Sequence, residues 1–293
     1  MEKKASIILS CLCAAAASLS CAPSGDTVRI GTYNLRVTVD KGDNAWSSRK
    51  YRLVESVRDN GFDIFGVQEA SLDTQAELPA LLDSAGMEYG CWFFSPYSQD
   101  GRGGKAQGIF YRRDRFRLSG KHFFWLSETP DSSTVNDTGA NGRFRRGGCC
   151  ATVEDLRHPG RRFFFMVSHG PLNPAPNSRS AEIYNEMERR YNTGGLPSVF
   201  VGDLNAPPSA RASSVLRETW TDSYMCLPDG SKSGPEGTFN GFRMPFPDST
   251  RRIDYVYFKG PGIRPVEYVC NGSLYDGCYA SDHFPVYVEM EIK

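Results

Sequence analysis

The chain has 293 residues with 34 basic and 34 acidic side chains, so its formal charge is zero. A neutral chain lacks the excess of lysine and arginine that sequence-independent binding to nucleic acid requires, which argues against a protein that wraps DNA, although the basic segment 143–146 offers a local patch. The nine cysteines show no Cys-x-x-Cys or Cys/His spacing of the kind that holds zinc.

The start of the chain has the pattern of an export signal. Two lysines are followed by an apolar stretch at 7–17 and by small residues before Cys21. This stretch is too short to span a bilayer as a stable helix. Cys21 is also typical of a bacterial lipoprotein acceptor, although Leu19 stands where a smaller residue is usual, and simple cleavage near Ala22 is the alternative.

We therefore expect residues 1–21 to be a signal peptide or lipoprotein signal. The protein is predicted to be exported, either to the periplasm or as a lipoprotein of the outer membrane or cell surface. In the second case, a lipidated Cys21 would hold it on the membrane.

Residues 26–293 are predicted to form one α/β domain, because no repeat or low-complexity linker divides them. Residues 21–293 carry a formal charge of −1, since two lysines and one glutamate precede them. In an oxidising compartment, Cys270 and Cys278 could form a disulfide across a short loop. Buried free thiols are the alternative for all six cysteines that follow Cys21.

Eight short runs rich in β-branched and aromatic residues predict strands. Some follow one another directly and others are separated by helical patterns. The sequence therefore predicts mixed sheets covered by helices rather than a purely parallel wound sheet. In chain order, the predicted strands are 28–33, 63–68, 91–94, 109–111, 163–168, 199–202, 253–258 and 286–289.

Three stretches have the periodicity of helices, and two segments rich in glycine and proline, at 170–177 and 228–247, predict surface loops near the site. The predicted helices run from Ser47 or Ser48 to Gly61, over 72–82 with Pro79 as an interruption, and over 180–191.

Polar side chains stand beside five of the strand-like runs. Any one of them could merely cap a turn, but together they favour an oxygen-rich pocket suited to Mg²⁺ and a phosphate, with a histidine able to act near neutral pH. The patches are Thr32-Tyr33-Asn34-Leu35, Val67-Gln68-Glu69, Gly202-Asp203-Leu204-Asn205, Arg252-Ile253-Asp254-Tyr255 and Ser281-Asp282-His283-Phe284.

The order of these motifs resembles the endonuclease/exonuclease/phosphatase superfamily over residues 28–292. The resemblance implies the DNase I-like fold, an α/β four-layer sandwich of two packed mixed β-sheets flanked by helices. Two further stretches, 124–130 and 237–242, look like secreted bacterial members of the group, and we assign them no chemical role.

The resemblance also implies a metal site and a water-activating group. Glu69 would be the main ligand of Mg²⁺ or Mn²⁺, with Asn34 helping to position metal or phosphate and Asp282 completing the shell. Asp203 would orient or deprotonate the attacking water, and Asn205 would donate a hydrogen bond to the phosphate.

Two histidines match the superfamily. His283, held by Asp254, would bind or protonate the phosphate, because a carboxylate partner favours the charged imidazole. His169 follows a strand where the superfamily has a second phosphate contact. The remaining two, His122 and His158, are expected to be surface or packing residues.

Two departures from the superfamily concern the surroundings of His169. The segment 170–172, Gly-Pro-Leu, replaces an acidic and a polar residue, and Lys105 stands where a supporting glutamate is common. A lysine there would leave His169 neutral and add positive charge beside the phosphate. Lys105, Arg146 and Asn240 are the expected substrate contacts.

The sequence thus predicts a metal-dependent phosphoesterase, expected to be monomeric, that cleaves a P–O bond by in-line attack of water. Phosphodiesters of nucleic acid are the default substrate by the breadth of the superfamily. Phospholipids and inositol phosphates are the alternative substrates, and a surface lipoprotein that binds a phosphorylated ligand without turnover is the alternative function.

Overall fold

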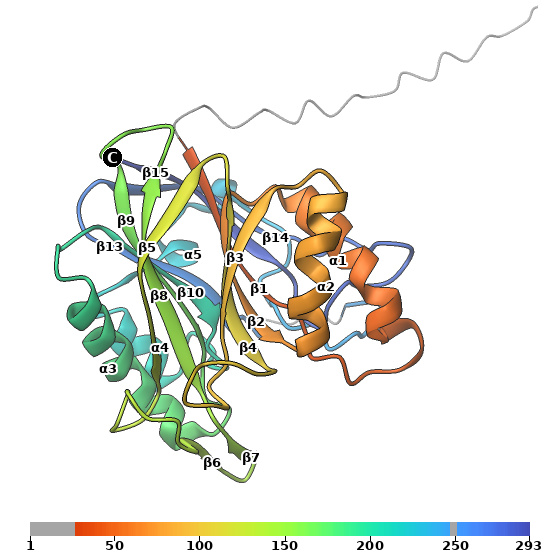
Figure 1. Cartoon of the computed structure of the whole chain (residues 1–293), viewed down its shortest axis with the longest axis horizontal. Coiled ribbons are helices and arrows are strands. Elements are labelled where there is room, and N and C mark those ends of the chain that lie inside the picture. The colour runs from red at the N-terminus through yellow and green to blue at the C-terminus, as the bar shows by residue number, and fades with distance from the viewer. Residues whose placement is uncertain (1–26, 247–250) are drawn as a thin grey trace, which may run out of the picture.

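The computed structural model describes residues 27–246 and 251–293, in which two β-sheets pack face to face and helices cover their outer sides (Figure 1). The predicted signal at 1–21 lies outside these residues. Both sheets mix parallel and antiparallel pairs, as predicted. No helix within the described ranges is long and apolar enough to cross a membrane.

The first sheet has seven strands in the order β12-β14-β15-β1-β2-β4-β3. Its outer face is covered by α1 and α2 (Figure 1). The elements are β1 (Thr27–Asn34), α1 (Trp46–Asn60), β2 (Ile64–Ala70), α2 (Leu72–Ser84), β3 (Tyr89–Phe94), β4 (Ala106–Arg112), β12 (Lys232–Ser233), β14 (Ile263–Cys270) and β15 (Val286–Ile292).

The second sheet has six strands in the order β11-β13-β10-β9-β8-β5, and α3 and α4 cover its outer face (Figure 1). A separate hairpin, β6-β7, projects from one end of the molecule (Figure 1). The elements are β5 (Phe116–Trp125), β6 (Asp137–Gly139), β7 (Gly142–Phe144), β8 (Gly147–Asp155), β9 (Arg162–His169), α3 (Pro174–Tyr191), β10 (Ser198–Asp203), α4 (Arg211–Leu216), β11 (Thr221–Asp222), α5 (Ser223–Cys226) and β13 (Asp254–Lys259), with short 3-10 turns at Gly42–Asn44 and Asp229–Ser231.

Burial on both faces explains why the central strands read as continuous apolar runs. In β10, Val199 and Val201 enter the core between the sheets, while Phe200 between them packs under α3 and α4. Gly66 of β2 lets the sheets approach closely, because a Cβ there would lie 2.6 Å from Val201 Cγ2.

The predicted four-layer α/β sandwich is confirmed, and all eight predicted strands are present. The other strands, β5, β8 and β14 and the short β6, β7, β11 and β12, were not predicted from the sequence. Strand β5 is buried at its two ends and exposed in its middle, so its sequence lacks a clear apolar alternation.

The predicted helix boundaries need three corrections. Helix α1 begins at Trp46 and has Ala45 as its N-cap, so neither predicted serine caps it, although Gly61 does end it in the left-handed conformation. Helix α2 continues through Pro79 to Ser84. Helix α3 begins at Pro174, so the segment 174–177 is helical and is not part of a loop.

Of the two alternatives left open for the cysteines, the disulfide between Cys270 and Cys278 is not formed, because both are free thiols. Cys270 ends strand β14 with its side chain fully buried, and its Sγ lies 3.9 Å from the carbonyl oxygen of Gly237. The alternative of buried free thiols holds for Cys149, Cys150 and Cys270.

Candidate active site

Strand register brings the polar patches to one end of the sheets. Parallel strands β1 and β2 end there at Asn34 and near Glu69, and parallel strands β9 and β10 end there at His169 and Asp203. Antiparallel strand β13 begins at the same end, since Asp254 pairs with Asp203. Strand β15 begins opposite Thr32, so the Asp282-His283 segment lies there as well.

Asp203 links side chains from both sheets. Its Oδ2 accepts a 3.0 Å hydrogen bond from Nδ2 of Asn34 and lies 3.4 Å from Nε2 of His169 and 3.7 Å from Nε2 of His283. Its Oδ1 accepts a 2.9 Å hydrogen bond from the backbone N–H of Asn205. These contacts hold one buried carboxylate in a fixed orientation.

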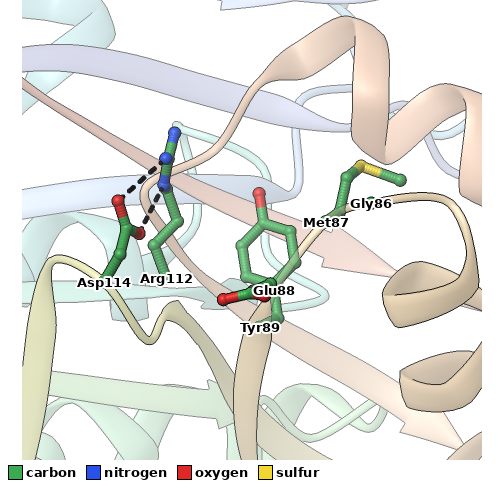
Figure 2. Close-up of a pocket in the computed structure, with 6 residues that line it drawn as sticks. All are labelled: Gly86, Met87, Glu88, Tyr89, Arg112 and Asp114. Atoms are coloured by element: carbon green, nitrogen blue, oxygen red, sulfur yellow. Dashed lines mark hydrogen bonds and ion pairs between the residues drawn. The ribbon is translucent and has the colours of Figure 1, made fainter.

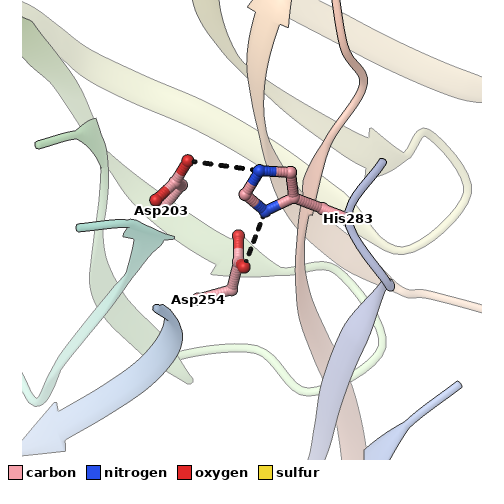
Figure 3. Close-up of side chains that lie close together, drawn as sticks. All are labelled: Asp203, Asp254 and His283. Carbon is pink, nitrogen blue, oxygen red and sulfur yellow. Dashed lines mark hydrogen bonds and ion pairs between the residues drawn. The ribbon is translucent and has the colours of Figure 1, made fainter. Parts of the chain in front are cut away.

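His283 lies between two carboxylates (Figure 3). Its Nδ1 lies 2.9 Å from Oδ2 of Asp254, while its Nε2 faces Asp203. The hydroxyl of Thr238 donates a 2.6 Å hydrogen bond to the same Oδ2 of Asp254. Thr238 and Asp254 therefore fix the imidazole ring and leave Nε2 directed toward Asp203.

The charges of this group favour a protonated histidine. Burial alone would lower the pKa of His283, but the charges of Asp254 and Asp203 and the hydrogen bond to Asp254 outweigh it and raise this pKa to about 10. Burial raises the pKa of Asp203, Asp254 raises it further, and His283 opposes both, giving a value of about 6. At pH 7, an ionised Asp203 therefore faces a charged His283.

His169 has the opposite charge state. Burial lowers its pKa well below the usual value, and the positive charges of Arg146, His283 and Lys105 lower it further. His169 is therefore neutral at physiological pH and acts as a hydrogen-bonding group rather than a cation.

Glu69 lines a cleft of about 160 Å³ at this end of the sheets. Its backbone has φ 60°, a strained value for a residue other than glycine, at an irregularity where β2 pairs with β4. Its Oε2 accepts a 3.1 Å hydrogen bond from the N–H of Val37. The strained backbone conformation thus occurs at the residue whose carboxylate lines the cleft.

Glu69 and Asp282 offer carboxylate oxygens, which fit a hard cation such as Mg²⁺. Asn34 offers an amide oxygen that already accepts a 3.0 Å hydrogen bond from the backbone N–H of Arg36, so only its second lone pair is left for a cation. Burial raises the pKa of Asp282, the charge of His283 lowers it, and the nearby charge of Glu69 raises it. Arg36 lies beside the same carboxylate, with Nη1 3.4 Å from Oδ2 of Asp282. A bound divalent cation would relieve the repulsion between Glu69 and Asp282.

A second group could also hold a metal ion. Ligand atoms of Asp203, Asp254 and His283 lie within 4.8 Å of one another (Figure 3). Asp254 Oδ1 is buried without a hydrogen-bond partner. However, the imidazole of His283 is already bonded to Asp254 and favours its protonated form, which cannot bind a metal through the same nitrogens. We therefore interpret this group as proton-handling.

Cations surround the cleft in which Glu69 lies. Four basic residues line it, together with two aromatic side chains, one amide and His169. An excess of positive charge around a small concave site favours an anionic ligand. The lining residues are Arg36, Val37, Glu69, Tyr97, Lys105, Gln107, Phe144, Arg145, Arg146 and His169.

Two of the three expected substrate contacts, Lys105 and Arg146, line this cleft. Asn240 does not. Its Nδ2 donates to the carbonyl oxygen of Ser281 at 3.1 Å, and its Oδ1 accepts from the N–H of Phe242 at 2.8 Å. Because both ends of this buried side chain are already used, Asn240 supports the backbone beside Asp282 instead.

Asn205 has a similar constraint. Its Nδ2 donates a 3.1 Å hydrogen bond to the carbonyl oxygen of Gly170, which uses one of its two N–H groups. The backbone of Asn205 has φ 49°, and its N–H orients Asp203. The structure therefore gives Asn205 a positioning role.

A buried aspartate that sequence reasoning missed organises the rim of the cleft. Asp137 of β6 pairs with Nε of Arg146 at 3.2 Å and accepts hydrogen bonds from the backbone N–H groups of Leu172 and Asn173 at 2.8 and 3.0 Å. It thereby ties the hairpin to the segment that follows His169. No carboxylate lies in that segment of the sequence, and a distant strand supplies one.

The two stretches without an assigned role both support the site. The hydroxyl of Thr238, in the stretch 237–242, contacts Asp254, and the backbone of Phe239 forms an isolated antiparallel β-bridge with that of His283. In the stretch 124–130, Nε1 of Trp125 donates a 2.8 Å hydrogen bond to the carbonyl oxygen of Pro96, next to Tyr97 of the cleft. Neither contact follows from a local sequence pattern.

Another cavity, of about 340 Å³, lies at the opposite ends of β3 and β4 (Figure 2). It is lined by a segment at 86–89 together with Arg112 and Asp114, which form an ion pair at 3.0 Å. Arg112 and Asp114 neutralise each other, Glu88 leaves one negative charge in excess, and the lining residues include no histidine. The chemistry therefore gathers at one end of the sheets only.

Comparison with known proteins agrees with this geometry. The model of the Endonuclease/Exonuclease/phosphatase family matches residues 31–283. The fold is similar to a family protein from Bacteroides thetaiotaomicron, with 25% identity and a TM-score of 0.80 over 91% of this chain and 98% of that one. No protein with a curated description matches the sequence.

Two further solved structures are informative. A mannosyl-6-phosphatase from Bacteroides thetaiotaomicron is 26% identical, with a TM-score of 0.78 over 90% of this chain and 99% of that one. The catalytic domain of human Nocturnin, solved with a bound sulfate, has 18% identity and a TM-score of 0.67 over 92% and 95% of the two chains. The second likeness concerns the fold alone.

Proposed function

Since the chain belongs to the endonuclease/exonuclease/phosphatase family, whose members act on phosphoesters, we propose that it is a divalent-metal-dependent phosphoester hydrolase. The observation that carries the proposal is the arrangement of His283 between Asp254 and Asp203 beside a cationic cleft lined by Glu69. A binding module needs a cationic cleft but has no use for a buried carboxylate positioned to accept a proton.

In this proposal, Asp203 orients and deprotonates the attacking water. Its Oδ2 is the proposed acceptor, since this oxygen faces Nε2 of both His169 and His283. A pKa of about 6 leaves the carboxylate ionised at pH 7 yet basic enough to take a proton. Asn34 donates to the same oxygen and keeps it in place.

His283 supplies positive charge to the phosphate. With Nδ1 held by Asp254, the proton on Nε2 is the one available for a phosphoryl oxygen or leaving group. Neutral His169 offers a further hydrogen bond next to Asp203. Fixed donors of this kind stabilise the charge that develops in the transition state.

Glu69, with Asn34 and Asp282, is the proposed holder of Mg²⁺ or Mn²⁺. When bound, such a cation polarises the phosphoryl oxygens and offsets charge in the transition state. The residues of the chain then position water, substrate and protons around it.

The cleft favours a small and highly charged phosphate. A phosphomonoester carries nearly two negative charges at pH 7, whereas a diester carries one. Four basic residues around about 160 Å³ suit the former, or a phosphate with another anion nearby, better than a duplex of nucleic acid. The similar mannosyl-6-phosphatase acts on a phosphorylated sugar, which makes small phosphomonoesters the first substrates to test.

The test is hydrolysis by protein that lacks residues 1–21. With Mg²⁺ present, we expect turnover of 4-nitrophenyl phosphate or bis(4-nitrophenyl) phosphate. A panel of sugar phosphates, inositol phosphates, sphingomyelin, RNA and single-stranded DNA would then identify the substrate class. Complete inactivity of folded protein on every phosphoester, with either metal, would refute the proposal.

The assignment of Glu69 as a metal ligand is tested by a variant of that residue. Glu69→Gln should weaken Mn²⁺ binding in calorimetry at least about tenfold, because it removes a charged ligand. The matched control is Glu88→Gln, since Glu88 lies in the other cavity and should leave metal binding unchanged (Figure 2). Equal metal affinity of the Glu69→Gln variant and the wild type would place the metal elsewhere.

We further propose that the enzyme acts outside the cytoplasm on a substrate that reaches the periplasm or cell surface. The export pattern at 1–21 is the support for this part.

A further inference from the structure

The cations of the cleft are not equivalent, because only two of them have acidic partners. Arg36 pairs with Asp40 at 2.9 Å and with Asp282 at 3.4 Å. Arg146 pairs with Asp137 at 3.2 Å. Within 27–246 and 251–293, no carboxylate lies within ion-pair distance of the other two cations, Lys105 and Arg145.

These two cations meet at Tyr97. The ammonium of Lys105 lies 5.6 Å from the centre of the Tyr97 ring, and Nη1 of Arg145 donates a 2.9 Å hydrogen bond to the Tyr97 carbonyl oxygen. Two segments far apart in sequence thus present positive charge at one residue, Lys105 at its ring and Arg145 at its backbone. Tyr97 and Arg145 are both half-buried, and Lys105 is exposed.

The surroundings hold this group in place. The carbonyl oxygen of Pro96 accepts hydrogen bonds from Trp125 Nε1 at 2.8 Å and from the Ser133 hydroxyl at 2.9 Å, which fixes the segment before Tyr97. Lys105 adopts φ 54°, a conformation that residues other than glycine keep only where the structure requires it. Tyr97 and the Arg145 guanidinium are therefore held in place, and the backbone of Lys105 sets the side of Tyr97 from which its exposed ammonium group approaches.

The proposed reaction centre already supplies partners for the phosphate that is hydrolysed. In the proposed reaction, the phosphate being hydrolysed is met by His283, by the cation at Glu69 and by the hydrogen bonds around Asp203. Placing two cations close together costs electrostatic energy unless an anion compensates them. The spare positive charge therefore indicates a second negative group on the same ligand.

We propose that Lys105, Arg145 and Tyr97 form a second anion site, so that the substrate carries another phosphate or similar anionic group beside the phosphate that is hydrolysed. This inference rests on the proposed hydrolase function and specifies its substrate class. The aromatic ring of Tyr97 would contact the part of the substrate that joins the two anions, while Arg145 provides a planar pair of donors for the remote one.

The test uses phosphonates, which cannot be hydrolysed. Alkane monophosphonates and α,ω-diphosphonates of matched chain length compete against an activated phosphoester, with excess Mg²⁺ to buffer chelation. At the chain length that spans the two sites, we expect the diphosphonate to inhibit the wild type about tenfold more strongly than the monophosphonate, the size expected for a charge-assisted contact.

The variants assign that gain to particular side chains. Arg145→Gln and Lys105→Gln should each reduce the ratio of the two inhibition constants to within about twofold of one, and Arg145→Lys should retain part of it. Arg143→Gln is the matched control, because Arg143 is exposed on the same hairpin and does not line the cleft. It should keep the wild-type ratio and rate. Chelation by the inhibitors affects all variants equally and cannot produce this pattern.

The outcomes separate the two proposals. Equal inhibition by both phosphonates at every chain length, in an enzyme that hydrolyses its ester, would overturn the second anion site and leave the hydrolase function intact. A gain that survives in Arg145→Gln and Lys105→Gln alike would also overturn it. Absence of any turnover would instead contradict the proposed function, and calorimetry with the same phosphonates would then test the anion site directly.

Discussion

At one end of the sheets, Arg115 is buried between Asp63 and Asp155, and at the other end His283 is buried between Asp254 and Asp203. Both arrangements place a cation between two carboxylates from different strands. Arginine side chains do not release a proton in proteins, and the guanidinium of Arg115 also donates to the carbonyl oxygen of Thr27 at 2.8 Å.

The histidine group differs because its members titrate. The pKa of Asp203 is raised to about 6 and that of His283 to about 10, so small changes in their surroundings can move a proton. The Arg115 group therefore stabilises the fold, and the His283 group is available for chemistry. Burial and charge pairing alone do not distinguish the two, whereas the ability to exchange a proton does.

The largest expected effect comes from applying the same substitution at each end. Asp203→Asn should lower kcat on an activated phosphoester by ~10²–10⁴, because it removes the proton acceptor. The free energy of unfolding should change little, since the variant loses a charge that burial disfavours along with one hydrogen-bond acceptor. Steady-state kinetics and thermal unfolding measure the two effects.

Asp155→Asn is the matched change at the far end. It should lower the free energy of unfolding by about 1–3 kcal/mol, because Arg115 and Arg161 lose a charged acceptor, and it should leave kcat/KM unchanged. The reverse pattern would contradict the comparison: a stable but inactive Asp155→Asn variant together with an unstable but active Asp203→Asn variant.

Replacing Arg115, the cation between Asp63 and Asp155, tests whether that group stabilises the fold. Arg115→Met should reduce the free energy of unfolding by about 3 kcal/mol, because Asp63 is then buried without its ion-pair partner and Asp155 keeps only Arg161. Denaturant unfolding at pH 7 measures this, and an unchanged free energy of unfolding would contradict the explanation.

The pH profile of hydrolysis should reflect the titration of Asp203 and His283. Activity needs Asp203 ionised and His283 protonated, so kcat/KM should rise through about pH 6 and fall through about pH 10, changing about tenfold per pH unit outside these limits. In Asp203→Asn, the acid limb should disappear from the residual activity.

The same groups affect stability with a definite sign. His283 has a raised pKa in the folded protein, so its contribution is fully present below its unfolded pKa near 6.5 and is lost as the pH rises toward 10. Asp203 also has a raised pKa, so the fold loses stability as the pH rises from about 4 to 6. His283→Gln should therefore flatten the difference in stability between pH 7 and pH 10.

The smallest effect is expected at the rim of the cleft. Asp137→Asn should raise KM about fivefold to tenfold with a smaller change in kcat, because Arg146 loses its charged anchor while Asp203 and His283 remain in place. An equal loss in kcat with unchanged KM would show that Asp137 acts on the reacting group instead.

Sequence patterns predicted the core of this molecule well, for a physical reason. Strands buried on both faces, such as Val199–Val201, must be apolar throughout, and the polar residue that follows marks the strand end. Strand β5 could not be predicted in the same way, because its middle is exposed and its residues follow no regular alternation.

The site was predictable only in part. Its motifs follow strand ends directly, so Asn34, Glu69 and Asp203 could be recognised as polar residues beside apolar runs. Support from a distance could not be recognised. Asp137 accepts a hydrogen bond from the backbone N–H of Asn173, which lies 36 residues away in the sequence. In the sequence, Arg145 stands out only as part of the basic segment 143–146.

The direct test of the central claim is metal-dependent hydrolysis by the protein that lacks residues 1–21. The side chains that converge from both sheets are proposed to cleave a phosphoester with a divalent cation at Glu69. Turnover of the activated ester should stop when EDTA removes the metal and return when excess Mg²⁺ is added. Turnover that continues unchanged in excess EDTA would contradict the account.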